Sequence, residues 1–423
     1  MAITFVDQPD KDYKYPAWND VNYVVNSNNT AEDGFKIIAK VYVSTLLKQT
    51  FNLYVHPGTT RAYLNAAKVI QNFITDEYQG KKETPSIAAS QTLNEVYLTF
   101  QEYYDGSVQG SVATSDTIYC WRAAFPPIFM KDLDFNRWQL LSGLSAHDGE
   151  IKMLTGFENT ITGTSGANPG TISLNSNILK LKEGQRFFLR FIRDSTAINI
   201  NAQVRIGLYD DTGTRTHSDV LTFVAMAEDS LQDFAIGTDE VEDHSWLTGF
   251  TLDSDDKYMA IEVTGQVYAQ TYNYLFELDW TPCNAYENYE VHWLNRYGGF
   301  DSWVFDRNSK KEIEVVQESH KMNPFDISSP TYDPSSRFVK PHFTQLADTI
   351  EMNTQNIKEW EYQGLRDLFT SPEIYVKVAT EYAEYFVSAV VENNSMVMNN
   401  RTQDGIFNVN VKLKIDNSEQ RQW

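Results

Sequence analysis

The sequence predicts a mainly β protein with a few helices, built from two or three β-sandwich domains. Aromatic residues make up 13% of the chain, with 24 Tyr, 24 Phe and 9 Trp, and together with Val, Ile and Thr they suit pleated sheet surfaces. Short apolar runs recur between turn-forming residues, which is typical of strands. The 423 residues exceed the roughly 250–300 at which one hydrophobic core stops growing, so more than one domain is expected.

Residues 1–147 are expected to form an N-terminal β-rich domain with one helix. The helix is predicted over residues 61–78, where apolar residues recur at helical spacing. Residues 108–115 (VQGSVATS) are expected to form a loop, because Gly, Ser and Thr dominate there. Strands are expected at residues 22–25, 35–43, 50–55, 93–103 and 117–125.

Residues 148–282 are expected to form a central β-sandwich of jelly-roll type, because short strands alternate with turn signals and helical periodicity is nearly absent. Asp210-Asp211-Thr212-Gly213 has the composition of a hairpin turn. Residues 163–170 (GTSGANPG) are expected to be a loop. Strands are expected at residues 186–192, 204–209, 258–263 and 272–280.

Residues 283–423 are expected to form a C-terminal β-rich domain that contains a hairpin, a proline-rich arm and one helix. The arm, residues 323–341, contains four prolines, which remove backbone donors and fix φ and so exclude a helix or a central strand. It either reaches a neighbouring subunit or packs on its own domain. The helix is predicted over residues 357–369, and residues 405–415 have the alternation of a final strand.

The chain is organised around one stretch of this last domain, Tyr289 to Phe305 (YEVHWLNRYGGFDSWVF). On both sides of a Gly-Gly pair, aromatic and aliphatic residues alternate with period two, which is typical of strands. Gly298 and Gly299 are expected to supply the positive φ angles that a tight connection needs. The stretch therefore predicts a β-hairpin.

The sequence LNRYGGFD within this hairpin resembles a segment of virion proteins from tailed bacteriophages of Bacteroidetes hosts, including crAss-like phages, in which L-N-R-x-G-G-x-D lies between two strands. Tyr15 to Val43 and Leu365 to Val376 (LRDLFTSPEIYV) fit the same resemblance. These pieces lie near the two ends of the chain. The central sandwich is therefore either an insertion into one larger domain or one of three successive domains.

The resemblance implies a structural component of the tail, neck or baseplate that assembles as a symmetric ring, with other tail or neck proteins as neighbours. It also implies a location in the virion after synthesis in the bacterial host cytoplasm. We expect the hairpin to supply the structural and interaction residues. The candidates are Trp293, Asn295, Arg296, Gly298, Gly299, Phe300, Asp301 and Trp303.

Charge argues against nucleic acid as the main ligand. The formal net charge is −22, and the chain has no run of Lys or Arg of the kind that neutralises phosphates. An acidic surface would let a phage genome slide past, but it also serves solubility. The sequence has no apolar run long enough to span a bilayer and no signal peptide at its start. Cys120 and Cys283 are expected to be reduced, buried thiols, with a disulfide as the alternative.

No catalytic, cofactor-binding or metal-binding residue is predicted. The seven histidines are never within five residues of one another, and neither a metal signature, a nucleophile elbow, a Walker loop nor a dinucleotide fingerprint occurs. Ten acidic residues lie between Glu228 and Asp256 without a Lys or Arg. They are expected to form a solvated acidic loop, because the order of an EF-hand is missing; a Ca²⁺ site is the alternative.

Three functions follow in order of preference. The first is a non-enzymatic building block of a phage particle. The second is a receptor- or glycan-binding tail-fibre or surface module, in which aromatic side chains of the central sandwich stack on sugar rings. The third is an enzyme that degrades host polysaccharide, which needs a pair of carboxylates that the sequence does not select. The aromatic candidates are Trp246, Tyr258, Tyr268, Tyr272 and Tyr274, and a place in the hydrophobic core is their alternative.

Overall fold

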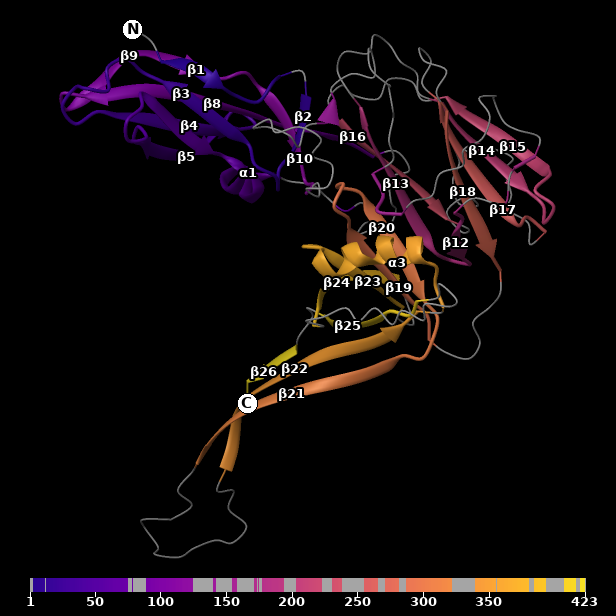
Figure 1. The fold of residues 1–423 in the computed structure, drawn as a ribbon. Coiled ribbons are helices and arrows are strands. Elements are labelled where there is room, and N and C mark those ends of the chain that lie inside the picture. Colours follow the sequence, from indigo (N-terminus) through magenta and orange to yellow (C-terminus); the bar gives the residue numbers. More distant parts are fainter. Residues whose placement is uncertain are drawn as a thin grey trace, which may run out of the picture. The chain divides into compact units, whose positions relative to one another are not determined.

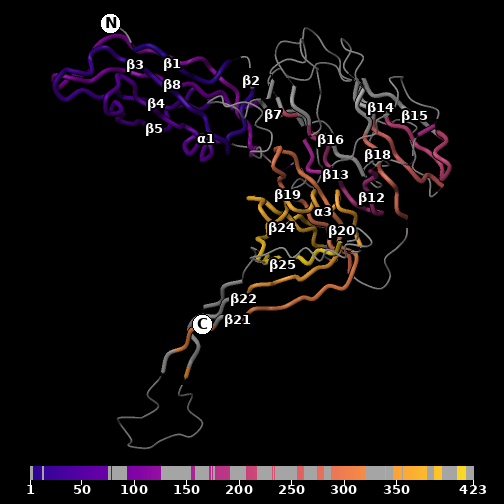
Figure 2. The backbone as a smooth tube through the Cα atoms, in the orientation of Figure 1, coloured from indigo at the N-terminus to yellow at the C-terminus, as the bar shows by residue number. Residues whose placement is uncertain are grey.

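The computed structural model describes residues 3–11, 13–74, 78, 89–124, 140–141, 154–157, 171–172, 174, 177–193, 203–222, 230–237, 255–264, 271–280, 287–321, 339–354, 356–379, 384–392, 407–415 and 419–422. The chain forms two compact units. Unit 1 comprises Met1–Thr281 and Leu294–Asp301, and unit 2 comprises Pro282–Trp293 and Ser302–Trp423. Strands dominate the described residues (Figure 1 and Figure 2), which confirms the prediction of a mainly β chain with few helices.

The first part of unit 1 is a sandwich of two sheets. Their strands, in spatial order, are β1 (Thr4–Asp7), β3 (Asn22–Asn26) and β6 (Arg61–Asn65) in the smaller sheet, and β11 (Leu140–Leu141), β2 (Tyr13–Pro16), β10 (Ile118–Trp121), β8 (Asn94–Tyr104), β4 (Lys36–Val43) and β5 (Leu46–Leu53) in the larger, where β9 (Ser107–Thr114) also pairs with β8.

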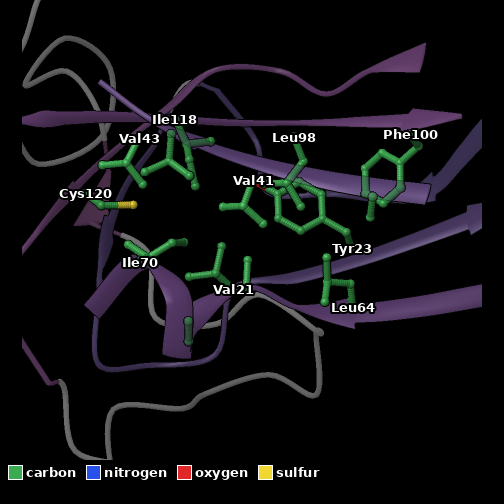
Figure 3. Close-up of a cluster of buried hydrophobic side chains, with 14 of the residues drawn as sticks. Val21, Tyr23, Val41, Val43, Leu64, Ile70, Leu98, Phe100, Ile118 and Cys120 are labelled. Carbon is green, nitrogen blue, oxygen red and sulfur yellow. The ribbon is translucent and has the colours of Figure 1, made fainter. Parts of the chain in front are cut away.

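The core of this sandwich follows from alternation along the strands. In β4, every second residue is buried, and Val41 meets Leu98 and Phe100 of β8 and Tyr23 of β3 in one apolar cluster (Figure 3). Ile70 of the short helix α1 (Ala67–Phe73) belongs to the same cluster. Each fully buried aliphatic or Phe side chain contributes about 1.5–3 kcal/mol to folding, so this cluster is a main source of stability for the sandwich.

The rest of unit 1 contains a second pair of sheets. Their strands, in spatial order, are β12 (Leu179–Lys182), β18 (Thr271–Asp279), β17 (Tyr258–Thr264), β14 (Gln203–Tyr209) and β15 (Arg215–Thr222) in the larger sheet, and β13 (Arg186–Arg193), β16 (Ser230–Gly237) and β7 (Ala89–Thr92) in the smaller. The rings of Phe187 on β13 and Phe276 on β18 lie 5.4 Å apart between centroids. The two sheets therefore pack face to face, as a sandwich requires.

Strand pairing crosses the predicted boundary near residue 147. The strand β7 comes from the predicted N-terminal segment, yet it pairs antiparallel with β16 of the central segment. The predicted segments 1–147 and 148–282 accordingly fall together in unit 1, except that Pro282 belongs to unit 2. Unit 2 corresponds to the predicted segment 283–423 apart from Leu294–Asp301.

Unit 2 is built on one eight-stranded sheet. Its strands, in spatial order, are β20 (Phe300–Phe305), β19 (Tyr289–Leu294), β23 (Ile374–Ala379), β24 (Glu384–Val391), β25 (Asn410–Ile415), β22 (Val339–Asn353) and β21 (Lys310–Lys321), and β26 (Glu419–Gln422) also pairs with β22. The predicted final strand is confirmed in β25, where Val411 and Leu413 are buried.

The helix predicted over residues 357–369 is confirmed as α3 (Glu359–Leu365) followed by the 3₁₀ helix η3 (Arg366–Thr370). At its start, the Glu361 carboxylate accepts a hydrogen bond of 2.7 Å from the backbone N–H of Lys358. Such a bond satisfies one of the donors that the first turn of a helix leaves open.

The predicted helix over residues 61–78 is wrong in its first part. Arg61–Asn65 forms strand β6, in which Ala62 and Leu64 are buried while Arg61 and Tyr63 are exposed. This segment has a period of two as well as helical spacing, and its pairing with β3 decides in favour of the strand. The helix is limited to α1.

The predicted loop at residues 108–115 is also wrong, because Ser107–Thr114 is strand β9. It joins β8 through Asp105-Gly106, both of which have positive φ, the pattern of a two-residue hairpin turn. Asp-Gly is a strong sequence signal for this turn. The polar composition of β9 reflects its largely exposed position.

Most of the predicted proline-rich arm lies outside the described residues. Its last proline, Pro341, is inside strand β22, which lies between β25 and β21 in the sheet. The expectation that the prolines exclude a central strand is therefore wrong at this residue. Pro341 lies opposite Ser319, where the register between β21 and β22 shifts. A β-bulge of this kind is one of the few strand positions that tolerate the missing N–H of proline.

Candidate functional site: the buried hairpin tip

The predicted hairpin is confirmed as β19 and β20, joined by residues 295–299, of which 296–298 form a three-residue loop closed by Asn295 and Gly299. The backbone N–H of Gly298 donates to the carbonyl oxygen of Asn295 at 3.0 Å, and the N–H of Asn295 donates to the carbonyl oxygen of Gly299 at 2.8 Å. Gly298 has φ +89°, as expected where a three-residue loop ends in a glycine bulge. The expectation that both glycines need positive φ is wrong, because Gly299 does not have it.

The Asn295 side chain fixes the loop from inside. Its Oδ1 accepts hydrogen bonds from the backbone N–H groups of Tyr297 at 2.9 Å and Gly299 at 3.1 Å. Its Nδ2 donates to the carbonyl oxygen of Leu154 and to Oδ2 of Asp301, both at 2.9 Å. All four hydrogen-bonding positions of the amide are therefore used, which a residue only 3% exposed requires.

Asp301 holds the other end of the loop and is fully buried. Its Oδ1 accepts from the Thr155 hydroxyl at 2.6 Å, and its Oδ2 accepts from the backbone N–H of Gly156 at 2.8 Å as well as from Asn295. A buried carboxylate needs such donors because removal from water is costly. Asp301 thus links the hairpin to the segment 154–157.

Both glycines are required by the close approach of the neighbouring backbone. A Cβ placed on Gly299 would lie 1.7 Å from the carbonyl oxygen of Leu154, and one on Gly298 would lie 2.4 Å from that of Arg122. Either distance is far below van der Waals contact. The tip is therefore held against two separate parts of unit 1, both of which pass within a few ångströms of its backbone.

Arg190 on β13 completes the enclosure. Its Nε and Nη2 donate to the two carboxylate oxygens of Asp233 at 2.5 and 2.7 Å, and its Nη1 donates to the carbonyl oxygen of Gly298 at 3.0 Å. The guanidinium carbon lies 5.2 Å from the centre of the Phe300 ring, within the range of a cation–π contact. Arg190 is 1% exposed, so the bidentate pair lies in the interior.

Aromatic side chains line the remaining sides of the tip. The Phe300 ring lies 4.6 Å from that of Tyr78, which in turn lies 5.5 Å from Phe188. Within the loop itself, the carbonyl oxygen of Tyr297 accepts a hydrogen bond of 2.9 Å from the indole N–H of Trp121, at the end of β10. The tip is thus surrounded by packed rings as well as hydrogen bonds.

Of the eight predicted residues, the structure brings six together in this tip: Asn295, Arg296, Gly298, Gly299, Phe300 and Asp301 all belong to unit 1. The carbonyl oxygen of Arg296 accepts from the backbone N–H of Ala124 at 2.7 Å. Trp293 and Trp303 belong to unit 2, where Trp293 is fully buried and Trp303 is half-buried.

Sequence reasoning missed Arg190, Asp233, Trp121 and Thr155. A signal for the first two was present: Asp233 is the single charge of SLQDFAIG, and Arg190 lies between apolar residues in RFFLRFIR. The two lie directly opposite in register. The expectation of a solvated acidic loop is wrong for Asp233, which lies in strand β16 and is 3% exposed. Asp256, from the same run, is also buried and accepts from the Thr216 hydroxyl.

The arrangement holds the hairpin tip in one conformation, since the polar groups of Asn295, Asp301 and Arg190 form hydrogen bonds with other parts of unit 1. Within the described residues, no group of three or more His, Cys, Asp or Glu side chains could hold a metal ion. In the same part of the chain, no helix has the length and apolar character to cross a membrane. Of the aromatic candidates in the central sandwich, Tyr274 is buried and Tyr258 packs against the core, while Trp246 and Tyr268 lie outside the described residues.

Fold and site together define a mainly β protein in which the tip of the β19–β20 hairpin is buried among other segments of unit 1. No family model matches the chain, and no curated protein matches it. Among solved structures, a similarity was found to trypsin-activated alpha-2-macroglobulin from Escherichia coli, with 8% sequence identity and a TM-score of 0.20. The match covers 97% of this chain and 23% of that protein's chain.

Proposed function

We propose that this chain is a non-enzymatic structural component of a tailed bacteriophage virion, placed in the tail, neck or baseplate, where copies assemble as a symmetric ring. The observation that supports it best is the hairpin tip. The segment that resembles phage virion proteins, L-N-R-x-G-G-x-D, is the segment whose turn is buried within unit 1. In it, the side chains of Asn295 and Asp301 hold the loop by hydrogen bonds. Gly298 and Gly299 leave room for the backbone of neighbouring segments.

This use of the motif suits a protein that acts through shape. The side chains of Asn295 and Asp301 form hydrogen bonds with other residues of the same chain. The two glycines allow close backbone contacts that a residue with a Cβ would block. A ring subunit needs such a rigid framework because each contact with a neighbour must recur identically around the axis. The proposed neighbours are copies of the chain and other tail or neck proteins.

Mass spectrometry of purified particles of the phage that encodes the chain tests the proposal. The chain is expected in the particles at a fixed ratio to the portal protein, and electron microscopy of particles from an amber mutant is expected to show a missing or incomplete tail. A chain that is abundant in infected cells but absent from purified particles would overturn the proposal.

A receptor- or glycan-binding module is the second candidate. Tyr54 and Tyr63 in unit 1 are 70% and 52% exposed, and exposed tyrosine rings can stack on sugars. A glycan array probed with the full chain tests this function. Binding that is lost in Tyr54→Ala and Tyr63→Ala, but kept in Tyr385→Ala, a similarly exposed tyrosine of unit 2, would favour the second candidate.

A further inference from the structure

The strand β21 lies at one end of the eight-stranded sheet of unit 2. It is twelve residues long and pairs with β22 along its whole length. Within the described residues, no strand pairs with its other side. Natural proteins usually keep edge strands short or protect them, because unpaired backbone groups invite another strand. A long edge of this kind can accept a second strand.

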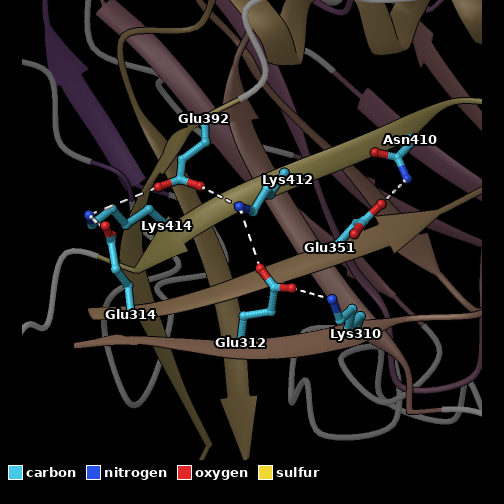
Figure 4. A network of polar contacts seen from close by, with 8 residues as sticks. All are labelled: Lys310, Glu312, Glu314, Glu351, Glu392, Asn410, Lys412 and Lys414. Carbon is cyan, nitrogen blue, oxygen red and sulfur yellow. Dashed lines mark hydrogen bonds and ion pairs between the residues drawn. The ribbon is translucent and has the colours of Figure 1, made fainter. Parts of the chain in front are cut away.

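One face of β21 is charged and is engaged with its own sheet. Lys310, Glu312 and Glu314 point to the same side as Lys412 and Lys414 of β25, and ion pairs join them (Figure 4). The Nζ of Lys414 lies 2.9 Å from a carboxylate oxygen of Glu314, and the Nζ of Lys412 lies 3.6 Å from one of Glu312. These carboxylates are therefore partly neutralised at the edge.

The other face of β21 carries two exposed apolar side chains, Ile313 and Val315, between Lys311 and Gln317. Ile313 and Val315 are 66% and 51% exposed. Lys311 of the same face lies opposite Ile350, which lies opposite Leu413, and both Ile350 and Leu413 are buried. On the neighbouring strand β22, Ile313 lies opposite the exposed Asp348 and Val315 lies opposite the partly buried Leu346. Ile313 and Val315 are thus two exposed apolar side chains at the edge of the sheet.

We propose that β21 pairs antiparallel with β21 of a second copy, centred on Glu314, so that the free protein is a two-fold dimer through this edge. In that register Ile313 faces Val315 of the second copy, and Lys310 faces Glu318 of the second copy, each twice by symmetry. In the same register Lys311 faces Gln317 and Glu312 faces Val316 of the second copy. Nine consecutive residues, 310–318, take part.

The adjacent registers are less favourable. Centring the pair on Ile313 places Glu312 opposite Glu314 of the other copy, and centring it on Val315 places Glu312 opposite Glu318, again twice each. Like charges directly opposite one another destabilise a sheet. In the proposed register only Glu314 faces its own counterpart, and the ion pair with Lys414 offsets that repulsion.

The dimer goes beyond the proposed function, because a two-fold contact closes at two copies whereas a ring needs a heterologous contact. It describes the free protein before assembly, when an open edge would otherwise promote aggregation. The two proposals can fail separately: the dimer is judged on purified protein in solution, and the virion role on particles.

Disulfide trapping in the full chain tests the register. Opposed Cα atoms in an antiparallel pair lie about 4.5–5.5 Å apart, within the range of a disulfide. The Glu314→Cys variant is therefore expected to form a covalent dimer on mild oxidation, and Gln317→Cys, which faces Lys311, is expected to stay uncross-linked. Lys310→Cys and Glu318→Cys should cross-link when mixed and not separately. The unmodified chain, in which Cys120 is buried, gives the background.

Analytical ultracentrifugation tests the apolar contact. The unmodified chain is expected to sediment as a dimer at micromolar concentration, and Ile313→Lys as a folded monomer with an unchanged circular dichroism spectrum. Val112→Lys is the matched control, because Val112 is a similarly exposed strand residue of unit 1 (52%), and it is expected to remain a dimer. A monomeric unmodified chain, or a Glu314→Cys variant that cross-links no more than Gln317→Cys, overturns the proposal.

Discussion

Arg190 and Asp233 face each other directly across β13 and β16 and form a bidentate ion pair in the interior of unit 1. Arg190 also donates to the carbonyl oxygen of Gly298 at the hairpin tip. The pair thus joins two strands of the central sandwich to a turn that lies 108 residues after Arg190 in sequence. This relationship gives the first prediction.

Replacing Asp233 by Ala should destabilise the protein by about 3–5 kcal/mol, because a buried guanidinium is left without its counter-ion. Arg190→Met with Asp233→Leu should recover most of that loss, since neither charge then remains. Glu314→Ala, which removes one partner of an exposed ion pair, should change the stability far less than Asp233→Ala, because solvent screens that pair. Urea unfolding followed by tryptophan fluorescence measures all three, and equal losses for Asp233→Ala and Glu314→Ala would contradict the interior role.

The glycines of the tip should differ in their sensitivity. Gly299→Ala is expected to be the most harmful change, because its Cβ would overlap a backbone carbonyl. Gly298→Ala should follow, and Gly298→Val should cost at least about 1–3 kcal/mol because φ is positive there. Gly58→Ala is the control, with φ +76° and open space around it. Thermal unfolding gives the order, and a Gly299→Ala variant as stable as Gly58→Ala would refute the close approach.

Asn295→Asp should be far more harmful than its size suggests. The change removes both amide donors and places a second carboxylate beside Asp301, and each buried group left without its hydrogen bond costs about 1–3 kcal/mol. Asn410→Asp makes the same change at an exposed amide that also donates to a carboxylate, Glu351, and should alter stability little. Denaturant midpoints of the two variants should therefore separate clearly.

The exposed ion pairs between β21 and β25 should change the pKa values of the β21 carboxylates. The hydrogen bond from Lys414 lowers the pKa of Glu314, and the hydrogen bond from Lys310 lowers that of Glu312. A lowered folded-state pKa means that the contribution to stability is present above the unfolded pKa and is lost as the pH falls through the folded one. In Lys414→Met, NMR titration should show the pKa of Glu314 rising toward its ordinary value while that of Glu312 stays low.

Local pattern was a good guide where one period dominated. The alternation in YEVHWL and FDSWVF predicted β19 and β20, and the spacing of residues 357–369 predicted α3 and η3. It was a poor guide at Arg61–Asn65, where two periods coexist, and at Ser107–Thr114, where an exposed strand is rich in Gly, Ser and Thr. In both places the pairing partner determined the structure.

The candidate site shows the same division. Asn295, Gly298, Gly299 and Asp301 could be selected from the sequence, but the need for a glycine at 299 could not, because it arises from the carbonyl of Leu154. Nothing in the hairpin sequence points to Leu154 or Arg190. Contacts between segments far apart in the chain become visible only when the fold is known.

By itself, the sequence determined the class of this protein: a mainly β chain with strands, turns and a Gly-Gly hairpin, because periodicity and turn chemistry act over a few neighbouring residues. The tertiary structure alone decided that β7 pairs with β16, that Asp233 is an interior counter-ion and that the hairpin tip is enclosed. Burial and long-range pairing depend on which distant segments come into contact, and the local sequence does not specify those segments.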